Sequence, residues 1–228
     1  NGTMIRKIGD GKHDITSIYG YNEENGDVYY QAAALNPHDR QVFVSHKNGK
    51  VERLTDQEGW NSAIFSGDYQ FFINTWSNYN TPYTFTLRSQ KDKVLSVLLD
   101  NSKLKDKMAE YGWSKREPFT FTTSEGISLD GWMLKPNNFD PSHKYPVILF
   151  QYSGPGSQQV VDSWKAGSLG NGGAFDQYLV QQGFIVVCVD GRGTGGRGAK
   201  FEKCIYQQMG VLESKDQVET ALWLGNQT

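Results

Sequence analysis

One segment of the sequence places a phenol where hydrolytic chemistry could use it. The segment spans residues 151–157 and directly follows the apolar run 147–150. A polar residue at the carboxyl end of a central parallel strand points into the crevice where open α/β folds bind ligands. We therefore expect Tyr152 to reach such a crevice, where its hydroxyl could donate a hydrogen bond to an oxyanion. A tyrosine packed at the strand end with a solvated hydroxyl explains its position alone equally well.

A glycine-rich run is the second candidate for chemistry. Residues 191–196 satisfy G-x-G-x-x-G between an expected strand and an expected helix, and Asp216 follows about twenty residues later, as in dinucleotide sites. The ribose-binding acid of such sites ends the next strand, however, whereas Asp216 is expected in the first turn of a helix. Arg192 and Arg197 also crowd the turn. We favour a tight structural turn and keep a dinucleotide site as the alternative.

Other catalytic and metal-binding patterns are missing from the sequence. No G-x-S-x-G elbow and no Walker A motif occurs. The four histidines lie in the β-rich part or in polar turns, and no Cys/His cluster has the spacing of metal ligands; they are His13, His38, His46 and His143. We therefore predict no metal and no cofactor, and structural or surface roles for the histidines.

The composition restricts the class of protein. The 228 residues are 37% hydrophobic, with 25 Gly, 2 Cys and a net charge of −2, which is typical of a globular protein. The longest apolar run, 184–189, is far shorter than the ~20 residues that cross a bilayer, and no basic patch suggests nucleic acid. Neither a membrane span nor a nucleic-acid partner is expected.

The first hundred residues alternate like short antiparallel strands. A weak repeat of roughly 40–45 residues is typical of propeller blades with four strands each. The expected strands are 15–21, 27–30, 41–44 and 51–54 in one unit and 62–66, 68–71, 83–86 and 94–97 in the next. Because closure of a propeller takes about four to eight blades, we expect these two to belong to a longer protein.

The remaining residues change from all-β to α/β character after a short helix at 102–111. Residues 119–122 and 127–133 predict a hairpin, and the buried runs 147–150 and 184–189 predict parallel strands. A helix between these strands carries Phe175, Tyr178 and Leu179 at helical spacing. Further helices are expected from Phe201 to Gly210, and from a capping box at Ser214 to Gly225 with Val218, Ala221 and Leu222 facing inward.

Three motifs in order carry a resemblance to a known family: K-Y-P at 144–146, Q-Y-S-G-P at 151–155 and V-D-G-R-G-T-G at 189–195. With the upstream repeat and E-S-K-D-Q-V-E at 213–219, the chain resembles the dipeptidyl peptidase IV branch of the prolyl oligopeptidase family. The resemblance implies that residues 1–100 are the last two propeller blades and that 101–228 are the N-terminal part of an α/β-hydrolase domain, ending before the catalytic serine elbow.

The resemblance also implies roles for single residues. Tyr152 matches the family tyrosine that supplies one oxyanion-hole donor, and Asp190 and Arg192 match a D-G-R-G turn that we interpret as architecture. The chain lacks the Ser, Asp and His of the triad, so we expect it to be inactive alone. The implied parent is a serine exopeptidase that removes N-terminal Xaa-Pro or Xaa-Ala dipeptides from peptides.

Other functions stay open at this point. A prolyl endopeptidase or an acylaminoacyl peptidase would share this half-domain, and so would a non-catalytic binding relative that lacks the elbow serine. The sequence gives no compartment or oligomeric state of its own. The resemblance implies a periplasmic or extracytoplasmic, homodimeric parent protein.

Overall fold

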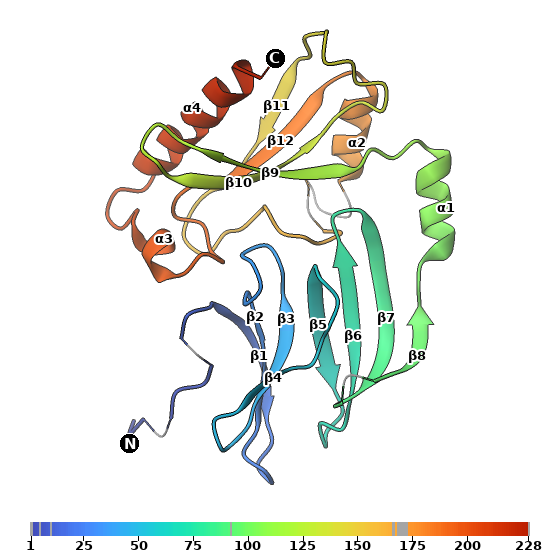
Figure 1. Cartoon of the computed structure of the whole chain (residues 1–228), viewed down its shortest axis with the longest axis vertical. Helices are drawn as coiled ribbons and strands as arrows, with labels where there is room; N and C mark the ends of the chain where they lie inside the picture. Colours follow the sequence, from blue (N-terminus) through green and yellow to red (C-terminus); the bar gives the residue numbers. More distant parts are fainter. Residues whose placement is uncertain are drawn as a thin grey trace.

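Three four-stranded sheets make up the architecture of the chain (Figure 1). The computed structural model describes residues 2–4, 6–9, 11–91, 93–165, 167 and 173–227. Two antiparallel sheets come first, with strands β1 Ile15–Tyr21, β2 Val28–Ala32, β3 Gln41–Ser45, β4 Val51–Arg53, then β5 Trp60–Phe65, β6 Phe71–Asn78, β7 Thr81–Ser89, β8 Val94–Leu99. The helix α1 Ser102–Glu110 follows and links them to an α/β part, as the sequence predicts.

The two antiparallel sheets are propeller-type blades whose strands neighbour one another in chain order. One expected strand, 68–71, is wrongly placed, because β6 begins only at Phe71. The preceding residues form a turn instead: Asp68 accepts hydrogen bonds from the Ser66 hydroxyl and the Gln70 N–H, and Tyr69 has a φ of 59°. Local side-chain bonding to the backbone is what favours a turn over a strand here.

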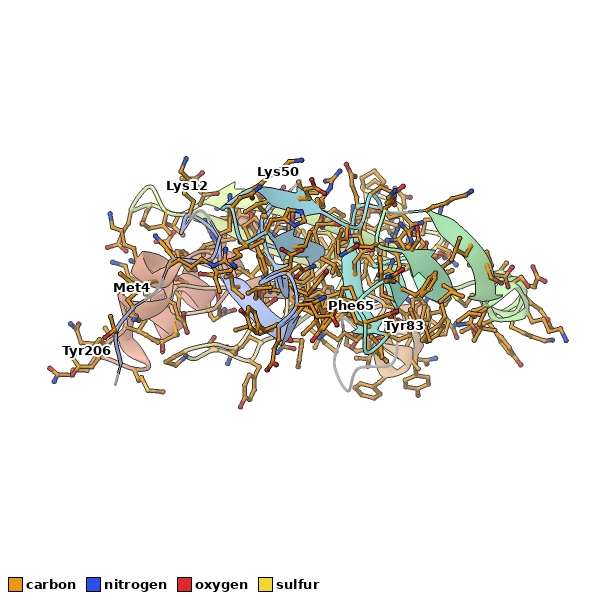
Figure 2. The ribbon with its side chains drawn as sticks, turned by 90° about the horizontal axis from the view of Figure 1, so that it is seen from below. Met4, Lys12, Lys50, Phe65, Tyr83 and Tyr206 are labelled. Atoms are coloured by element: carbon orange, nitrogen blue, oxygen red, sulfur yellow. The ribbon has the colours of Figure 1, made fainter. Side chains whose placement is uncertain are left out.

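An aromatic cluster fills the space between the blades. Phe65 of β5 packs within 5.8 Å, centroid to centroid, of Tyr19, Tyr29, Tyr69 and Phe72. Figure 2 shows Phe65 in the middle of the molecule, whereas Tyr206 lies at its outer edge. Because each blade alone would leave this face in water, the shared cluster holds the two sheets together.

The third sheet has the order β11-β12-β10-β9. Its strands are β9 Arg116–Thr122, β10 Ser128–Leu134, β11 Val147–Phe150 and β12 Ile185–Asp190, of which β11 and β12 run parallel. Side chains of β12 alternate between two cores: Val186 and Cys188 pack with α2 Ala174–Gln181, and Val187 and Val189 with the α4 side. The sheet therefore has a helix on each face, which buries both faces of β12.

The helices α3 Ala199–Lys203 and α4 Val211–Gly225 correct the sequence-based expectations. The first ends well before Gly210, which instead caps α4 and donates its N–H to Glu213, so the predicted box at Ser214 is wrong. Val218 and Leu222, expected inward, are exposed. Trp223 faces the sheet instead, stacked on Phe119 and Phe121 at 4.9 Å.

The inward face of α2 is also different from the expected one. Phe175 and Tyr178 are exposed, and only Leu179 of the predicted set packs against the core. Asp176 and Gln177 are buried in their place. Gln177 exchanges hydrogen bonds with the backbone of Ser114, which accounts for a polar side chain on the buried face. Within the described residues, no helix has the length and apolar character that spanning a membrane requires.

The second blade is hydrogen-bonded to the segment between β11 and α2. The Asp162 carboxylate accepts the N–H of Tyr79 at 2.6 Å, and the Ser77 hydroxyl accepts the N–H of Trp164 at 3.1 Å. Burial, with smaller contributions from the charges of Asp39 and Glu58, raises the pKa of Asp162 to about 6 against the opposing hydrogen bond from Tyr79. The folded protein therefore favours the protonated form of Asp162 more than the unfolded chain does.

We expect Asp162→Asn to stabilise the protein at pH 8. The pKa of Asp162 is raised in the folded protein from 3.8 to about 6, so the folded state binds the proton more tightly and this group's contribution to stability falls as the pH rises through that window. Asparagine still accepts the Tyr79 N–H but carries no charge. Because Asp162 is only half-buried, we expect a gain of about 1–2 kcal/mol at pH 8. Thermal unfolding at pH 8 and pH 4 measures it; an equal gain at both would contradict this explanation.

Candidate active site

Tyr152 lies two residues beyond the end of β11, at the carboxyl ends of the two parallel strands. Its side chain is 66% exposed and is not enclosed by hydrocarbon. It borders a groove of about 600 Å³ between the end of β11 and the start of α4. The other lining residues are Leu149, Gln151, Ser153, Met209, Gly210, Glu213, Ser214 and Gln217. The phenol therefore reaches the kind of crevice that its place in the sequence suggests.

A tight turn directly follows Tyr152. Gly154 and Gly156 have φ values of 131° and 75°, which L side chains rarely adopt. The Ser157 N–H and hydroxyl both donate to the Gly154 carbonyl, at 3.1 and 2.7 Å. The Ser153 hydroxyl donates to Gln151 at 2.6 Å. The turn reverses the chain so that residues 157–160 run back across the end of the sheet.

Asp190, the last residue of β12, receives this returning segment. Its carboxylate is buried and accepts the Gln159 N–H at 3.0 Å and the Val160 N–H at 2.8 Å. Burial raises the pKa of Asp190 to about 6, while the two N–H donors oppose the shift. The sequence motif predicted that Asp190 is part of a turn. It did not predict that Asp190 binds residues 151–160, which we call the Tyr152 segment.

The glycine-rich run 191–196 forms the tight turn that the sequence favours. A side chain at Gly193, where φ is 95°, would meet Ile205 at 2.5 Å. The Arg192 N–H donates to the Asp216 carboxylate at 2.7 Å. In a dinucleotide site such N–H groups would face phosphate, so this hydrogen bond supports the structural interpretation.

Arg192 and Asp216 form a partly buried ion pair between the turn and α4. The distance from Nη2 to Oδ1 is 2.6 Å, and Glu125 approaches the same guanidinium to 2.9 Å. The hydrogen bond to Asp216, and then the attraction of Glu125, raises the pKa of Arg192. Asp216 is buried one turn further into the helix than expected, so its role is to bind Arg192 rather than to favour the helix dipole.

The histidines do not gather at Tyr152. His38 lies 3.3 Å from Asp130, His46 lies 2.9 Å from Asp27, and the exposed His143 lies 2.9 Å from Asp140. In the described part of the chain, no three His, Cys, Asp or Glu side chains group as metal ligands would. None of the described residues that line the groove beside Tyr152 is a histidine.

Gln158 links the Tyr152 segment to the first blade, which sequence reasoning missed. Its side-chain amide donates to the Pro37 carbonyl at 2.8 Å, and its oxygen accepts a hydrogen bond from Arg40. These partners lie about 120 residues away in the sequence, and a single sequence carries no signal for contacts of that separation.

Comparison with family models finds two matches along the chain. Residues 1–83 match the model of the dipeptidyl peptidase IV N-terminal region. Residues 174–228 match the model of the prolyl oligopeptidase family. The two matches flank the segment that carries Tyr152.

Similar proteins cover the chain almost completely. The probable dipeptidyl peptidase 4 of Aspergillus flavus is 30% identical over 95% of this chain, and mouse dipeptidyl peptidase 8 is 30% identical over 96%. The crystal structure of Porphyromonas gingivalis dipeptidyl peptidase 4 has a TM-score of 0.89 and 39% identity over 99% of this chain. A putative dipeptidyl aminopeptidase IV from Bacteroides ovatus has a TM-score of 0.81 and 26% identity over 97% of this chain.

The chain is much shorter than these proteins. It spans 28% of the Aspergillus protein, 25% of the mouse protein and 31% of each of the two crystallised chains.

Proposed function

This chain belongs to the dipeptidyl peptidase IV branch of the prolyl oligopeptidase family, and from that premise we propose that it is part of a serine exopeptidase that removes N-terminal Xaa-Pro or Xaa-Ala dipeptides from peptides. In this proposal, residues 1–100 are the last two propeller blades and 101–228 the N-terminal part of the α/β-hydrolase domain. The observation that carries it is the likeness, over 99% of the chain, to a dipeptidyl peptidase 4 structure.

Within this activity, we assign Tyr152 the role of an oxyanion-hole donor. The reaction attacks a peptide carbonyl with a serine hydroxyl, while a histidine takes the proton and returns it to the leaving amine. The carbonyl oxygen becomes negatively charged, and the Tyr152 hydroxyl donates a hydrogen bond to it. The exposed ring beside the groove supports this role, because a phenol enclosed by hydrocarbon could not reach substrate.

The nucleophile itself is not supplied by this chain. Its sequence has no G-x-S-x-G elbow, so we propose that the serine, aspartate and histidine of the triad come from other residues of the parent protein. On this account the chain alone binds no substrate productively and is inactive.

A comparison of chromogenic substrates tests the proposed activity in the full-length parent. We expect release of the chromophore from Gly-Pro-p-nitroanilide, and loss of that activity when the substrate amino terminus is succinylated. Cleavage of the succinylated substrate would favour a prolyl endopeptidase, and cleavage of acetyl-Ala-p-nitroanilide an acylaminoacyl peptidase. No cleavage of any of the three would favour a non-catalytic binding protein.

A homodimeric parent is part of the same proposal. It rests on the family resemblance alone. Sedimentation velocity of the full-length protein tests it, and a monomer at micromolar concentration would contradict it.

A further inference from the structure

We propose that Asp190 is a positioning residue for Tyr152, and that the glycine-rich turn after it is the support on which the Tyr152 segment rests. The inference deepens the proposed function and rests on it, since positioning Tyr152 affects turnover only if Tyr152 contacts the oxyanion. It assigns a task to a motif that is neither a nucleotide site nor a part of the triad.

The Tyr152 segment is anchored at both of its ends to β12. At its start, Phe150 of β11 is paired with Cys188 of β12. At its far end, the Gln159 and Val160 N–H groups both point at the Asp190 carboxylate. The residues between these anchors include Tyr152 and the exposed turn. A single strand, β12, therefore holds both ends of the Tyr152 segment.

The glycine-rich turn contacts the segment directly. The Gly195 N–H donates to the Ser157 carbonyl at 2.8 Å. A side chain at Gly196, where φ is 85°, would meet the Gln158 amide at 2.7 Å. A larger residue at position 196 would therefore need both an unfavourable left-handed backbone and a shift of the Gln158 side chain.

The turn is itself held in place by α4. Asp216, which is buried, accepts hydrogen bonds from both the backbone N–H and the guanidinium of Arg192. Gly191 leaves room for this carboxylate, because a side chain there would meet the Asp216 Cβ at 3.1 Å. Helix α4 therefore contacts the glycine-rich turn, and the turn contacts the Tyr152 segment.

The Asp190 carboxyl group uses both of its oxygens to hold the segment. Oδ2 accepts from both the Gln159 and the Val160 N–H, and Oδ1 accepts from the Gln159 N–H alone. An asparagine would keep one acceptor and would place its NH₂ where one carboxylate oxygen lies, facing the Gln159 N–H donor against donor. This repulsion, together with the loss of the charge that strengthens both hydrogen bonds, favours a displaced segment. Asp190 is 5% exposed, so water cannot readily replace the lost acceptor.

A double-mutant cycle in the full-length enzyme tests the proposal with wild type, Asp190→Asn, Tyr152→Phe and the double variant. We expect Asp190→Asn to lower kcat by about tenfold or more, with KM within about twofold, because misplacing a catalytic donor by about 1 Å affects mainly the transition state. In the Tyr152→Phe background, Asp190→Asn should change kcat less than about twofold, since the donor that it positions is already gone.

A matched control separates positioning from folding. Asp27 is another buried aspartate, which accepts the Lys47 N–H and contacts His46 in the first blade. Asp27→Asn should leave kcat unchanged. If Asp190→Asn does not fold, Asp190→Glu replaces it in the cycle: it keeps the charge but is one methylene longer, and it should give the same loss of kcat and the same non-additivity.

The outcomes distinguish the positioning role of Asp190 from the oxyanion role of Tyr152. Equal losses from Asp190→Asn in both backgrounds, or an unchanged kcat in wild type, would overturn the positioning role while leaving the exopeptidase proposal intact. An unchanged kcat for Tyr152→Phe alone would instead overturn the oxyanion role and the positioning role together.

Discussion

Replacing Tyr152 by phenylalanine in the full-length protein is expected to lower kcat by about 10²–10³ while KM changes little. Phenylalanine keeps the ring and removes only the hydroxyl. The lost donor interacts with charge that exists only in the transition state, so ground-state binding of the peptide is spared. Because the Tyr152 side chain is 66% exposed, the substitution leaves no buried group without a partner, and stability should be unaffected.

The measurement is steady-state turnover of a dipeptidyl chromogenic substrate, together with a thermal unfolding scan. Tyr178→Phe is a matched control, because Tyr178 is also exposed but lies on α2 in the opposite core layer. Its kcat should equal that of wild type. A Tyr152→Phe enzyme with undiminished turnover would remove this residue from the mechanism.

Much of the architecture follows from local sequence signals. The first strand, 15–21, and the strand 147–150 are found at their predicted bounds, and the hairpin around residues 124–126 is confirmed. The expected burial of 147–150 is wrong, because β11 is the edge strand of its sheet and Val147 is exposed. These signals are strong because apolar alternation and uninterrupted apolar runs reflect burial on one or two faces of a sheet. The blade-plus-hydrolase architecture is confirmed by the likeness to dipeptidyl peptidase 4.

The inward faces of the helices were predicted wrongly for a physical reason. On α4 the apolar residues Val218 and Leu222 are exposed, whereas Asp216 is fully buried against Arg192. The hydrogen bonds that Asp216 accepts from the Arg192 N–H and guanidinium offset the cost of burying its charge. Hydrophobic spacing cannot anticipate this, because the partner comes from a different part of the chain.

The residues of the candidate site were likewise only partly predictable from the sequence. The sequence located Tyr152 from a strand followed by a polar residue, but its role remains a prediction. The two carboxylates that hold the neighbouring backbone, Asp190 and Asp162, could not be found from local pattern. Their donors lie 31 and 83 residues away, on Gln159 and Tyr79. Contacts of this kind depend on how the elements meet, which only the fold determines.

Removing the carboxylate of Asp176 is expected to destabilise the α/β part by about 3–5 kcal/mol. Asp176 of α2 is fully buried and lies 3.3 Å from Arg116 of β9, which is 2% exposed and packs over Trp132. Asp176→Ala leaves the guanidinium buried without this partner. The backbone of Gly173 passes close to the same guanidinium, since a Cβ there would meet the Arg116 Nη2 at 2.1 Å.

Urea unfolding of the full-length protein, monitored by tryptophan fluorescence, measures the loss. Glu110→Ala is the control, because Glu110 pairs with Lys107 on the exposed face of α1 at 2.6 Å, and such a surface pair contributes only about 0.3–0.5 kcal/mol. The double variant Arg116→Met/Asp176→Leu should recover part of the stability, since it removes both buried charges together. A midpoint for Asp176→Ala equal to that of Glu110→Ala would show that this buried pair does not hold β9 against α2, and the fully buried carboxylate would then need another explanation.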